Sequence, residues 1–262
     1  MKFANFGKII QVAAFGATIA LCASTTAFAG TISVTYLGAG VQAPSASTTT
    51  SVESFNGAAQ GNYGSLSNAI APTLTTNFNN NSAGITGTYS GAFTIAPADV
   101  FGGAGGTGNY ITTTQQDGGY TLTLSTGVNY FGYWLSALDA GNQVQLENNG
   151  VVVYTFVPQD LITALGNCPG SAYCLNPNGI GNNEQLYAYV NFFDTGGTFN
   201  QIVYTETIPG AGYESDNDAV DNLSAPPGGT PLNPVPEPSS LVLLGTGVLG
   251  VAGSLRRKLS AR

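Results

Sequence analysis

The chain has 262 residues with six Lys or Arg, fourteen Asp or Glu and no His, so its formal net charge is −8. All six basic residues lie before residue 9 or after residue 255, and residues 30–234 hold thirteen carboxylates without one cationic side chain. Such a chain repels phosphate backbones, which proteins bind through Lys and Arg, so nucleic-acid binding is excluded. It also offers no basic side chain to activate a serine nucleophile, which excludes a serine hydrolase.

Residues 1–29 are expected to form a secretory signal peptide. Lys2 precedes an apolar run over residues 9–21, and the small residues Ala27 and Ala29 stand directly before Gly30. Signal peptidase reads this small-x-small pattern, which predicts cleavage between Ala29 and Gly30. A buried core helix is the alternative for the apolar run, but basic residues vanish immediately after it.

Residues 30–224 are expected to form one all-β domain. Gly, Thr, Ser and Asn dominate this stretch, and runs of β-branched and aromatic residues recur between turns rich in Gly, Asn and Asp. The expected strands are residues 31–37, 87–95, 120–126, 129–138, 142–147, 151–157, 185–193 and 199–207. Eight or more short strands in about 200 residues predict a β-sandwich or jelly roll.

Three local features refine this expectation. The sequence Asn148-Asn149-Gly150 between two expected strands predicts a tight hairpin, since Asn and Gly tolerate positive φ angles. Residues 158–166 predict one short helix that begins at a Pro and ends at a Gly. Cys168 and Cys174 are the only cysteines left after the signal peptide, and an oxidising compartment would join them in a disulfide.

Gly103, Gly105 and Gly108 form a G-x-G-x-x-G pattern, which in dinucleotide-binding proteins lets the backbone approach a pyrophosphate. That use needs a strand before the pattern and a helix after it. Here the following sequence "NYITTT" is typical of an extended segment, so we expect a surface loop instead.

The segment "GYESDNDAVDN" concentrates carboxylates. If it forms a strand, Glu214, Asp216 and Asp218 lie on one face at a period of two, and Glu53 on an early strand could complete a Ca²⁺ site. The alternative is a solvated edge strand that uses charge to prevent edge-to-edge pairing. Two carboxylates would also suffice for a glycosidase, but no pair is marked as acid and nucleophile.

Aromatic residues suggest a second kind of site. On an expected strand, Tyr187 and Tyr189 share one face, and Trp134 lies on another strand. Exposed side chains of this kind stack on sugar rings, which would make a glycan-binding surface. The alternative is that they pack between two layers of the fold.

The C-terminal part divides into a linker and a terminal signal. Residues 225–234 are rich in Pro and predict an extended, semi-rigid spacer that holds the domain away from a membrane. Residues 235–262 contain Pro236-Glu237-Pro238, then an apolar stretch over residues 241–255, and then Arg256, Arg257 and Lys258. As a helix, the apolar stretch would span about 22 Å, a marginal transmembrane anchor with its basic end in the cytoplasm.

These three features in this order resemble the PEP-CTERM sorting signal of Gram-negative bacteria. The resemblance implies that the precursor is transiently anchored in the inner membrane. It also implies recognition by an exosortase at Pro236, Glu237 and Pro238, followed by release or attachment at the cell surface. The alternative is a plain single-pass anchor.

A second resemblance covers about a third of the domain. The runs "YFGYWLSALDAGNQVQLENNG" and "GYESDNDAVDNLS" are similar to landmarks of exosortase-dependent surface proteins, some of which resemble lectin-like sandwiches. Together the observations predict a non-catalytic structural or adhesive protein of the cell surface, exopolysaccharide matrix or biofilm. The alternatives are a carbohydrate-binding module, with or without Ca²⁺, and a carboxylate-pair glycosidase.

Overall fold

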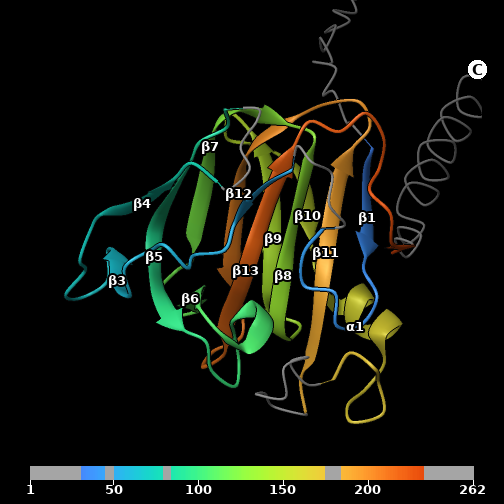
Figure 1. The fold of residues 1–262 in the computed structure, drawn as a ribbon, viewed down its shortest axis with the longest axis horizontal. Helices are drawn as coiled ribbons and strands as arrows, with labels where there is room; N and C mark the ends of the chain where they lie inside the picture. Colours follow the sequence, from blue (N-terminus) through green and yellow to red (C-terminus); the bar gives the residue numbers. More distant parts are fainter. Residues whose placement is uncertain (1–30, 45–49, 79–83, 175–183, 233–262) are drawn as a thin grey trace, which may run out of the picture.

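The computed structural model describes residues 31–44, 50–78, 84–174 and 184–232. Its strands are β1 (Ile32–Tyr36), β2 (Ser51–Glu53), β3 (Gly61–Gly64), β4 (Thr73–Thr76), β5 (Gly87–Pro97), β6 (Asn109–Thr114), β7 (Tyr120–Val128), β8 (Tyr130–Leu138), β9 (Asn142–Asn148), β10 (Val151–Phe156), β11 (Leu186–Asp194), β12 (Phe199–Glu206), β13 (Gly212–Asp221) and β14 (Thr230–Pro231). One α-helix, α1 (Gln159–Leu165), and one 3-10 turn, η1 (Ala104–Gly106), complete the described elements (Figure 1).

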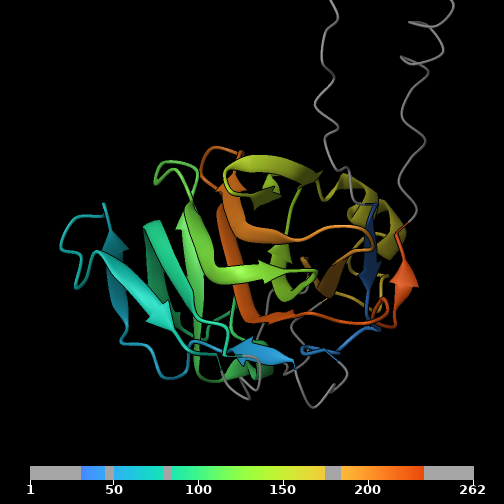
Figure 2. The ribbon, with the colours of Figure 1, turned by 90° about the horizontal axis from the view of Figure 1, so that it is seen from above.

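The strands form a single curled antiparallel sheet. Along its path the order is β10-β9-β12-β7-β5-β6-β13-β8-β11-β1-β14, while β2 pairs with β13, and β3 and β4 pair with β5. The curl is seen best from above (Figure 2), and β10 and β1, near the two ends of the path, line one groove. The all-β prediction is therefore confirmed, but the strand pairing describes a half-barrel in place of the two separate sheets of a sandwich.

Two long strands turn the sheet because they change partners along their length. The first half of β5 pairs with β4 and β7, and its second half pairs with β3 and β6. The change occurs at Gly91, whose φ is 113° and where a Cβ would lie 2.6 Å from the carbonyl oxygen of Gly119. Only glycine fits this corner. One edge of β13 pairs with β8, while its other edge pairs first with β6 and then with β2.

Two hydrophobic clusters hold the sheet together. The main cluster fills the inside of the curl and is rich in aromatic rings, such as Tyr120 and Tyr204, which stack with centroids 4.3 Å apart. A smaller cluster lies on the other face of β8, β11 and β13, where Val52 of β2, Ala104 of η1 and Leu223 pack against it. Because both faces are covered, every residue of β8 and β11 is buried.

Most of the expected elements are present within a residue or two of their predicted bounds. The eight expected strands correspond to β1, β5, β7, β8, β9, β10, β11 and β12, and the expected short helix is α1. The hairpin between β9 and β10 forms with Asn149 at φ 51° and Gly150 at φ 78°, as the turn sequence predicts. The sequence did not predict β2, β3, β4 or β14, which have only two to four residues each.

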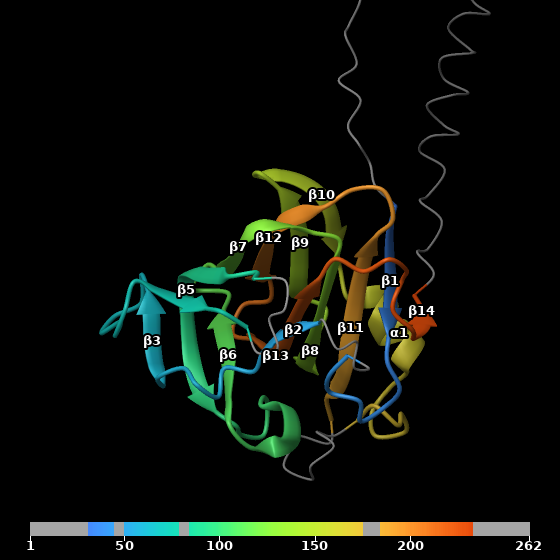
Figure 3. The same cartoon turned by 45° about the horizontal axis from the view of Figure 1, so that its top comes forward.

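The expected linker differs from a free spacer over the residues that the structure describes. Residues 225–232 lie against the domain, where β14 pairs with β1 (Figure 3). Pro226, Pro227 and Leu232 line the groove beside β1. The physical reason is that Leu232 contributes apolar surface, which packs against the main hydrophobic cluster. Asn233 and Pro234 lie outside the described residues.

Candidate functional site

Strand β13 brings the predicted carboxylates into the interior of the molecule. Its neighbour β8 aligns Glu214 with Ser136 and Asp216 with Trp134. Glu214 is 8% exposed, Asp216 2% and Asp218 0%. The expected solvated edge is therefore wrong, since β13 has partners on both edges and these side chains are enclosed.

The three carboxylates do not share one face of the strand. The register against β8 shifts between Asp216 and Ala219, and Asn217 adopts a positive φ of 51°, which marks a β-bulge. One extra residue reverses the alternation of side chains, so Asp218 points into the main core while Asp216 stays on the outer face. The hydrogen-bond partners agree, because Asp218 contacts Tyr89 and Asp216 contacts η1.

Asp218 is held by tyrosine hydroxyls. Tyr89 and Tyr204 both donate to Oδ2, over 2.9 and 2.8 Å, and Oδ1 has no hydrogen-bond partner among the described residues. The pKa of Asp218 is raised to about 7. Complete burial is the main cause, the hydrogen bonds from the two hydroxyls counteract part of the rise, and the charge of Glu53 adds to it. Without a cation nearby, protonation is the means by which the fold tolerates this carboxyl group.

The outer-face carboxylates have raised pKa values for the same reason. Burial, followed by the charges of Asp139 and Asp99, raises the pKa of Glu214 to about 8. Burial also raises the pKa of Asp216 well above its usual value, although the N–H groups of Ala104 and Asn217 donate to it over 2.7 Å each and counteract part of the rise. Ala104 belongs to the Gly-rich segment, which forms a loop as expected and closes over the sheet.

Glu53 lies on a strand next to β13, as expected, but its carboxylate binds its own turn instead of joining the other carboxylates. It is the register partner of Asp218 on the adjacent strand β2, so the early and late strands do meet. Its carboxylate accepts from the backbone N–H of Phe55 over 2.6 Å and from the Thr76 hydroxyl. It shapes the turn after β2, a structural use of the side chain.

The expected Ca²⁺ site is not assembled. Within residues 31–44, 50–78, 84–174 and 184–232, no three His, Cys, Asp or Glu side chains are grouped closely enough to hold a metal ion. The reason is geometric: the bulge sends Asp218 to the opposite face from Glu214 and Asp216, and Glu53 is bound to its own turn. Calcium needs six to eight oxygens converging on one point.

The expected glycan-stacking surface is also wrong. Trp134 and Tyr189 are 0% exposed and Tyr187 is 1% exposed, because loops cover the outer face of β8 and β11. Trp134 stacks on Tyr187 with centroids 6.2 Å apart, and the Tyr187 hydroxyl donates to the carbonyl oxygen of Val100. Trp134 Nε1 and Ser136 Oγ are buried without a hydrogen-bond partner in the described part of the chain.

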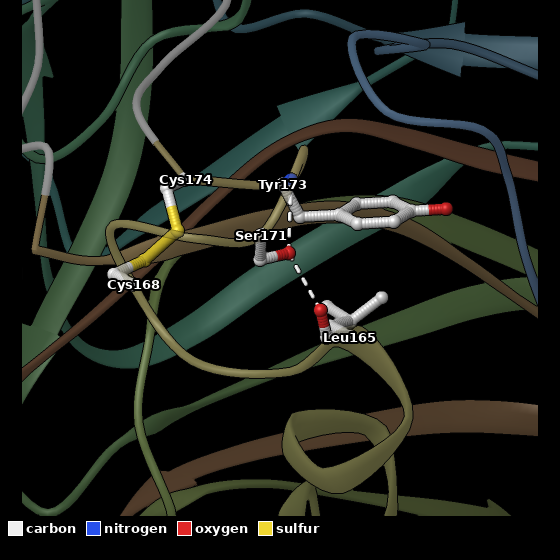
Figure 4. The surroundings of a disulfide bond; sticks show 5 residues. All are labelled: Leu165, Cys168, Ser171, Tyr173 and Cys174. Carbon is white, nitrogen blue, oxygen red and sulfur yellow. Dashed lines mark hydrogen bonds between the residues drawn. A yellow bond between two sulfur atoms is a disulfide. The ribbon is translucent and has the colours of Figure 1, made fainter.

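The predicted disulfide is present. Cys168 and Cys174 are joined with their Cα atoms 5.5 Å apart, beyond the end of α1 (Figure 4). Within the loop, the Ser171 hydroxyl donates to the carbonyl oxygen of Leu165 and accepts from the N–H of Tyr173. Tyr173 in turn donates to the carbonyl oxygen of Leu37, so the closed loop is tied to the segment after β1.

Sequence reasoning missed the partners that make these carboxylates tolerable. Tyr89 comes from β5 and Tyr204 from β12, more than a hundred residues apart, and nothing in their local sequence marks them as partners of Asp218. Ala104 acts through its backbone, which no residue pattern reveals. The one available signal was the lack of any cation, which required that buried carboxylates find neutral donors.

A groove lies elsewhere, beside β1 and β10, near the two ends of the sheet. The groove has a volume of about 610 Å³. It is lined by residues 31–35 of the β1 segment, residues 154–157 of the β10 segment, Asp160, and Pro226, Pro227, Gly229, Pro231 and Leu232 of the C-terminal segment. Its walls combine apolar side chains with hydroxyl groups, and Asp160 supplies its single carboxylate.

The processing signals lie outside the described residues. These are the expected cleavage site at Ala27, Ala29 and Gly30, the motif Pro236, Glu237 and Pro238, and the cluster Arg256, Arg257 and Lys258. Among the residues that are described, no helix has the length and apolar character needed to cross a membrane.

Comparison with known proteins places one part of the chain. Residues 234–258 match the family model of the PEP-CTERM protein-sorting motif, which includes the Pro236-Glu237-Pro238 triplet and the basic cluster. No curated protein and no solved structure gives a significant match to the chain. The chain is thus an exported protein that carries a PEP-CTERM sorting motif and is anchored in a membrane as a precursor for processing by an exosortase.

Proposed function

We propose that the β-domain is a non-catalytic structural or adhesive component of the cell surface or of the exopolysaccharide matrix of a biofilm. The observation that carries the proposal is a sorting motif joined to a domain that encloses the predicted site carboxylates Glu214, Asp216 and Asp218. Signal peptidase and then the exosortase process the precursor, and the folded domain is the product that acts outside the inner membrane.

The enclosure of the carboxylates supports a structural role. A glycosidase needs two carboxyl groups that reach a sugar in an open cleft. Glu214, Asp216 and Asp218 are at most 8% exposed, and Asp218 is bound to core tyrosines. The carboxylate cluster therefore gives the glycosidase alternative no support.

The carbohydrate-binding alternative would need a surface other than the one predicted. Trp134, Tyr187 and Tyr189 are core residues, so they cannot stack on a sugar. A matrix protein can instead act through its own fold and through many weak polar contacts with neutral or cation-bridged polysaccharide.

The proposal is tested in the producing bacterium with and without its exosortase. We expect the intact mass of the mature protein to show loss of residues after the motif only when the enzyme is present, and the protein to fractionate with the surface or matrix. Deletion of the gene should weaken cohesion of the matrix. Matrix unaffected by the deletion would refute the structural role.

A glycan array probed with the purified domain, with and without EDTA, separates the alternatives. No binding under either condition is expected for a structural protein. Saturable binding to one glycan would favour the carbohydrate-binding module, and turnover of a polysaccharide that is lost on a single Asp or Glu substitution would favour the glycosidase.

A further inference from the structure

The Gly-rich loop over the outer face of the sheet forms a closed unit. Residues 98–108 begin and end at one point, because the N–H of Ala98 donates to the carbonyl oxygen of Gly108 over 2.9 Å. Gly103, Gly105 and Gly108 adopt positive φ angles of 94°, 80° and 82°, which glycine accepts without strain. We call residues 98–108 the lid.

Polar contacts hold the lid on the sheet. The N–H of Ala104 donates to Asp216 of β13 over 2.7 Å, and the Tyr187 hydroxyl of β11 donates to the carbonyl oxygen of Val100 over 2.8 Å. Apolar burial contributes less, since Val100 and Phe101 are 44% and 41% exposed while the small side chain of Ala104 packs on the sheet. A segment held in this way can open while the rest of the sheet stays folded.

Two polar groups on the covered face would gain hydrogen bonds from water. Trp134 of β8 is the register partner of Asp216, and its Nε1 has no hydrogen-bond partner among the described residues. Ser136 stands opposite Glu214 in the same strand pair, and its Oγ is buried in the same condition. Water that enters under the lid can bind both atoms, which lowers the free energy needed to open it.

Ionisation of Asp216 favours the open lid. The side chain is 2% exposed in the closed arrangement, and this burial raises its pKa well above its usual value. An open lid would return the carboxyl group to water, where its pKa is about 4. The open state then binds fewer protons, so a rise in pH shifts the equilibrium toward it by at most about tenfold per pH unit.

No basic side chain opposes this shift, since residues 9–255 contain none. The titratable groups on the elements around Asp216 are acids or phenols, namely Asp99 of the lid, Tyr110 of β6, Tyr130 of β8, Tyr187 and Tyr189 of β11, Glu53 of β2, and Glu214 and Asp218 of β13. The charge of Asp99 also raises the pKa of Glu214. Opening of the lid moves this charge away from β13, so ionisation of Glu214 acts in the same direction as ionisation of Asp216.

We infer that residues 98–108 are a pH-dependent lid, which stays closed over Trp134 while Asp216 is protonated and opens when Asp216 ionises. Opening exposes the stacked rings of Trp134 and Tyr187, and Trp134 is the single Trp of the chain. The inference goes beyond the sorting and the matrix role proposed above and depends on neither.

Acrylamide quenching of Trp134 fluorescence tests the lid in the purified full-length protein. Between pH 5 and pH 8 we expect the quenching constant of wild type to rise at least about threefold. Asp216→Asn keeps an acceptor for the N–H of Ala104 but carries no charge, so its quenching should be low at both pH values. Asp117→Asn is the matched control, because it removes a carboxylate from the turn after β6 and should follow wild type.

Hydrogen exchange separates opening of the lid from unfolding of the domain. After correction for the intrinsic exchange rate, the amides of the lid, such as that of Ala104, should exchange faster at the higher pH while the amides of β8 stay protected. Wild-type quenching that does not change with pH, Asp216→Asn quenching that changes as much as wild type, or equal loss of protection in β8 would each overturn the inference. A chain that no exosortase processes would refute the proposed function instead and leave the lid unaffected.

Discussion

At the scale of single residues, Asp218 shows how this domain buries a carboxyl group without a cationic side chain to pair with it. A charged carboxylate inside a protein is normally paired with a cation, and none exists between residues 9 and 255. Two tyrosine hydroxyls take that role, and the raised pKa allows the group to be neutral in mildly acidic surroundings. Ionisation of this buried carboxyl group therefore destabilises the folded domain.

Asp218→Asn should make the free energy of unfolding of the domain depend less on pH. The amide oxygen can accept from Tyr89 and Tyr204 as the carboxylate does, but it carries no charge at pH 8. We expect urea unfolding at pH 8 to show Asp218→Asn more stable than wild type by about 1 kcal/mol or more, with a smaller difference at pH 5.

Asp117→Asn serves as the control for this measurement, because it also removes one carboxylate but in the turn after β6. A gain at pH 8 that is as large in the control would assign the effect to total charge. Equal loss of stability from pH 5 to pH 8 in wild type and Asp218→Asn would show that Asp218 does not contribute to it.

At the scale of elements, the sequence predicts most of the longer strands, but it predicts few of the strand pairings beyond the β9–β10 hairpin and the meeting of β2 with β13. Runs such as "VVVYTFV" have enough β-branched and aromatic residues to mark β10, and Asn149-Gly150 marks its turn. The strands β2, β3, β4 and β14 are too short to show a period of two, and their pairing with distant strands forms them.

The expected Ca²⁺ site is not assembled in part because of a single residue of β13. Period-two reasoning correctly placed Glu214 and Asp216 on one face, and the bulge at Asn217 then moved Asp218 to the other. Asn is the non-glycine residue that best tolerates a positive φ, so its identity was a usable signal. The burial of Trp134 and Tyr187 agrees with the alternative that the sequence left open, and the residues that cover them, such as Ala104 and Leu223, come from distant parts of the chain.

The bulge should be sensitive to the residue at position 217. Asn217→Gly and Asn217→Val both remove the hydrogen bond from the side chain to the carbonyl oxygen of Gln42, but only Val is strained at φ 51°. We expect Val to be less stable than Gly by about 1–2 kcal/mol in urea unfolding. Equal stabilities would mean that the bulge is not retained, which the amide spectra of the two variants would reveal.

At the scale of the whole molecule, the exported domain is a polyanion. After removal of both terminal signals it would hold thirteen carboxylates and no basic side chain, so its charge is far more negative than the overall −8 indicates. Such a molecule stays soluble and repels other anions, and it meets anionic polysaccharide only through bridging cations or neutral contacts.

The buried carboxyl groups and the uncompensated negative charge together predict that the free energy of unfolding falls as pH rises above about 5. Asp218 and Glu214 have folded-state pKa values of about 7 and 8, above those of an unfolded chain, so the folded state binds more protons. The stabilisation from each group is fully present below its unfolded pKa near 4, and it is lost as pH rises through the folded value, by at most about 1.4 kcal/mol per pH unit. Repulsion among surface carboxylates changes in the same direction.

Salt separates these two contributions. The free energy of unfolding is measured with urea from pH 4 to pH 9 in 0.05 and 0.5 M NaCl, where the Debye length is roughly 14 and 4 Å. The higher salt concentration screens repulsion between surface charges and affects buried groups much less. We expect a decline of stability between pH 5 and pH 8 that persists in high salt. Stability that increases up to pH 8 would show that these carboxyl groups are ionised at little cost.

Calcium should not restore stability at pH 8, because the carboxylates lie on two faces of β13. The same urea unfolding with and without Ca²⁺ measures this, and a calcium-dependent rise in the free energy of unfolding would show that the fold rearranges to bring the carboxylates together.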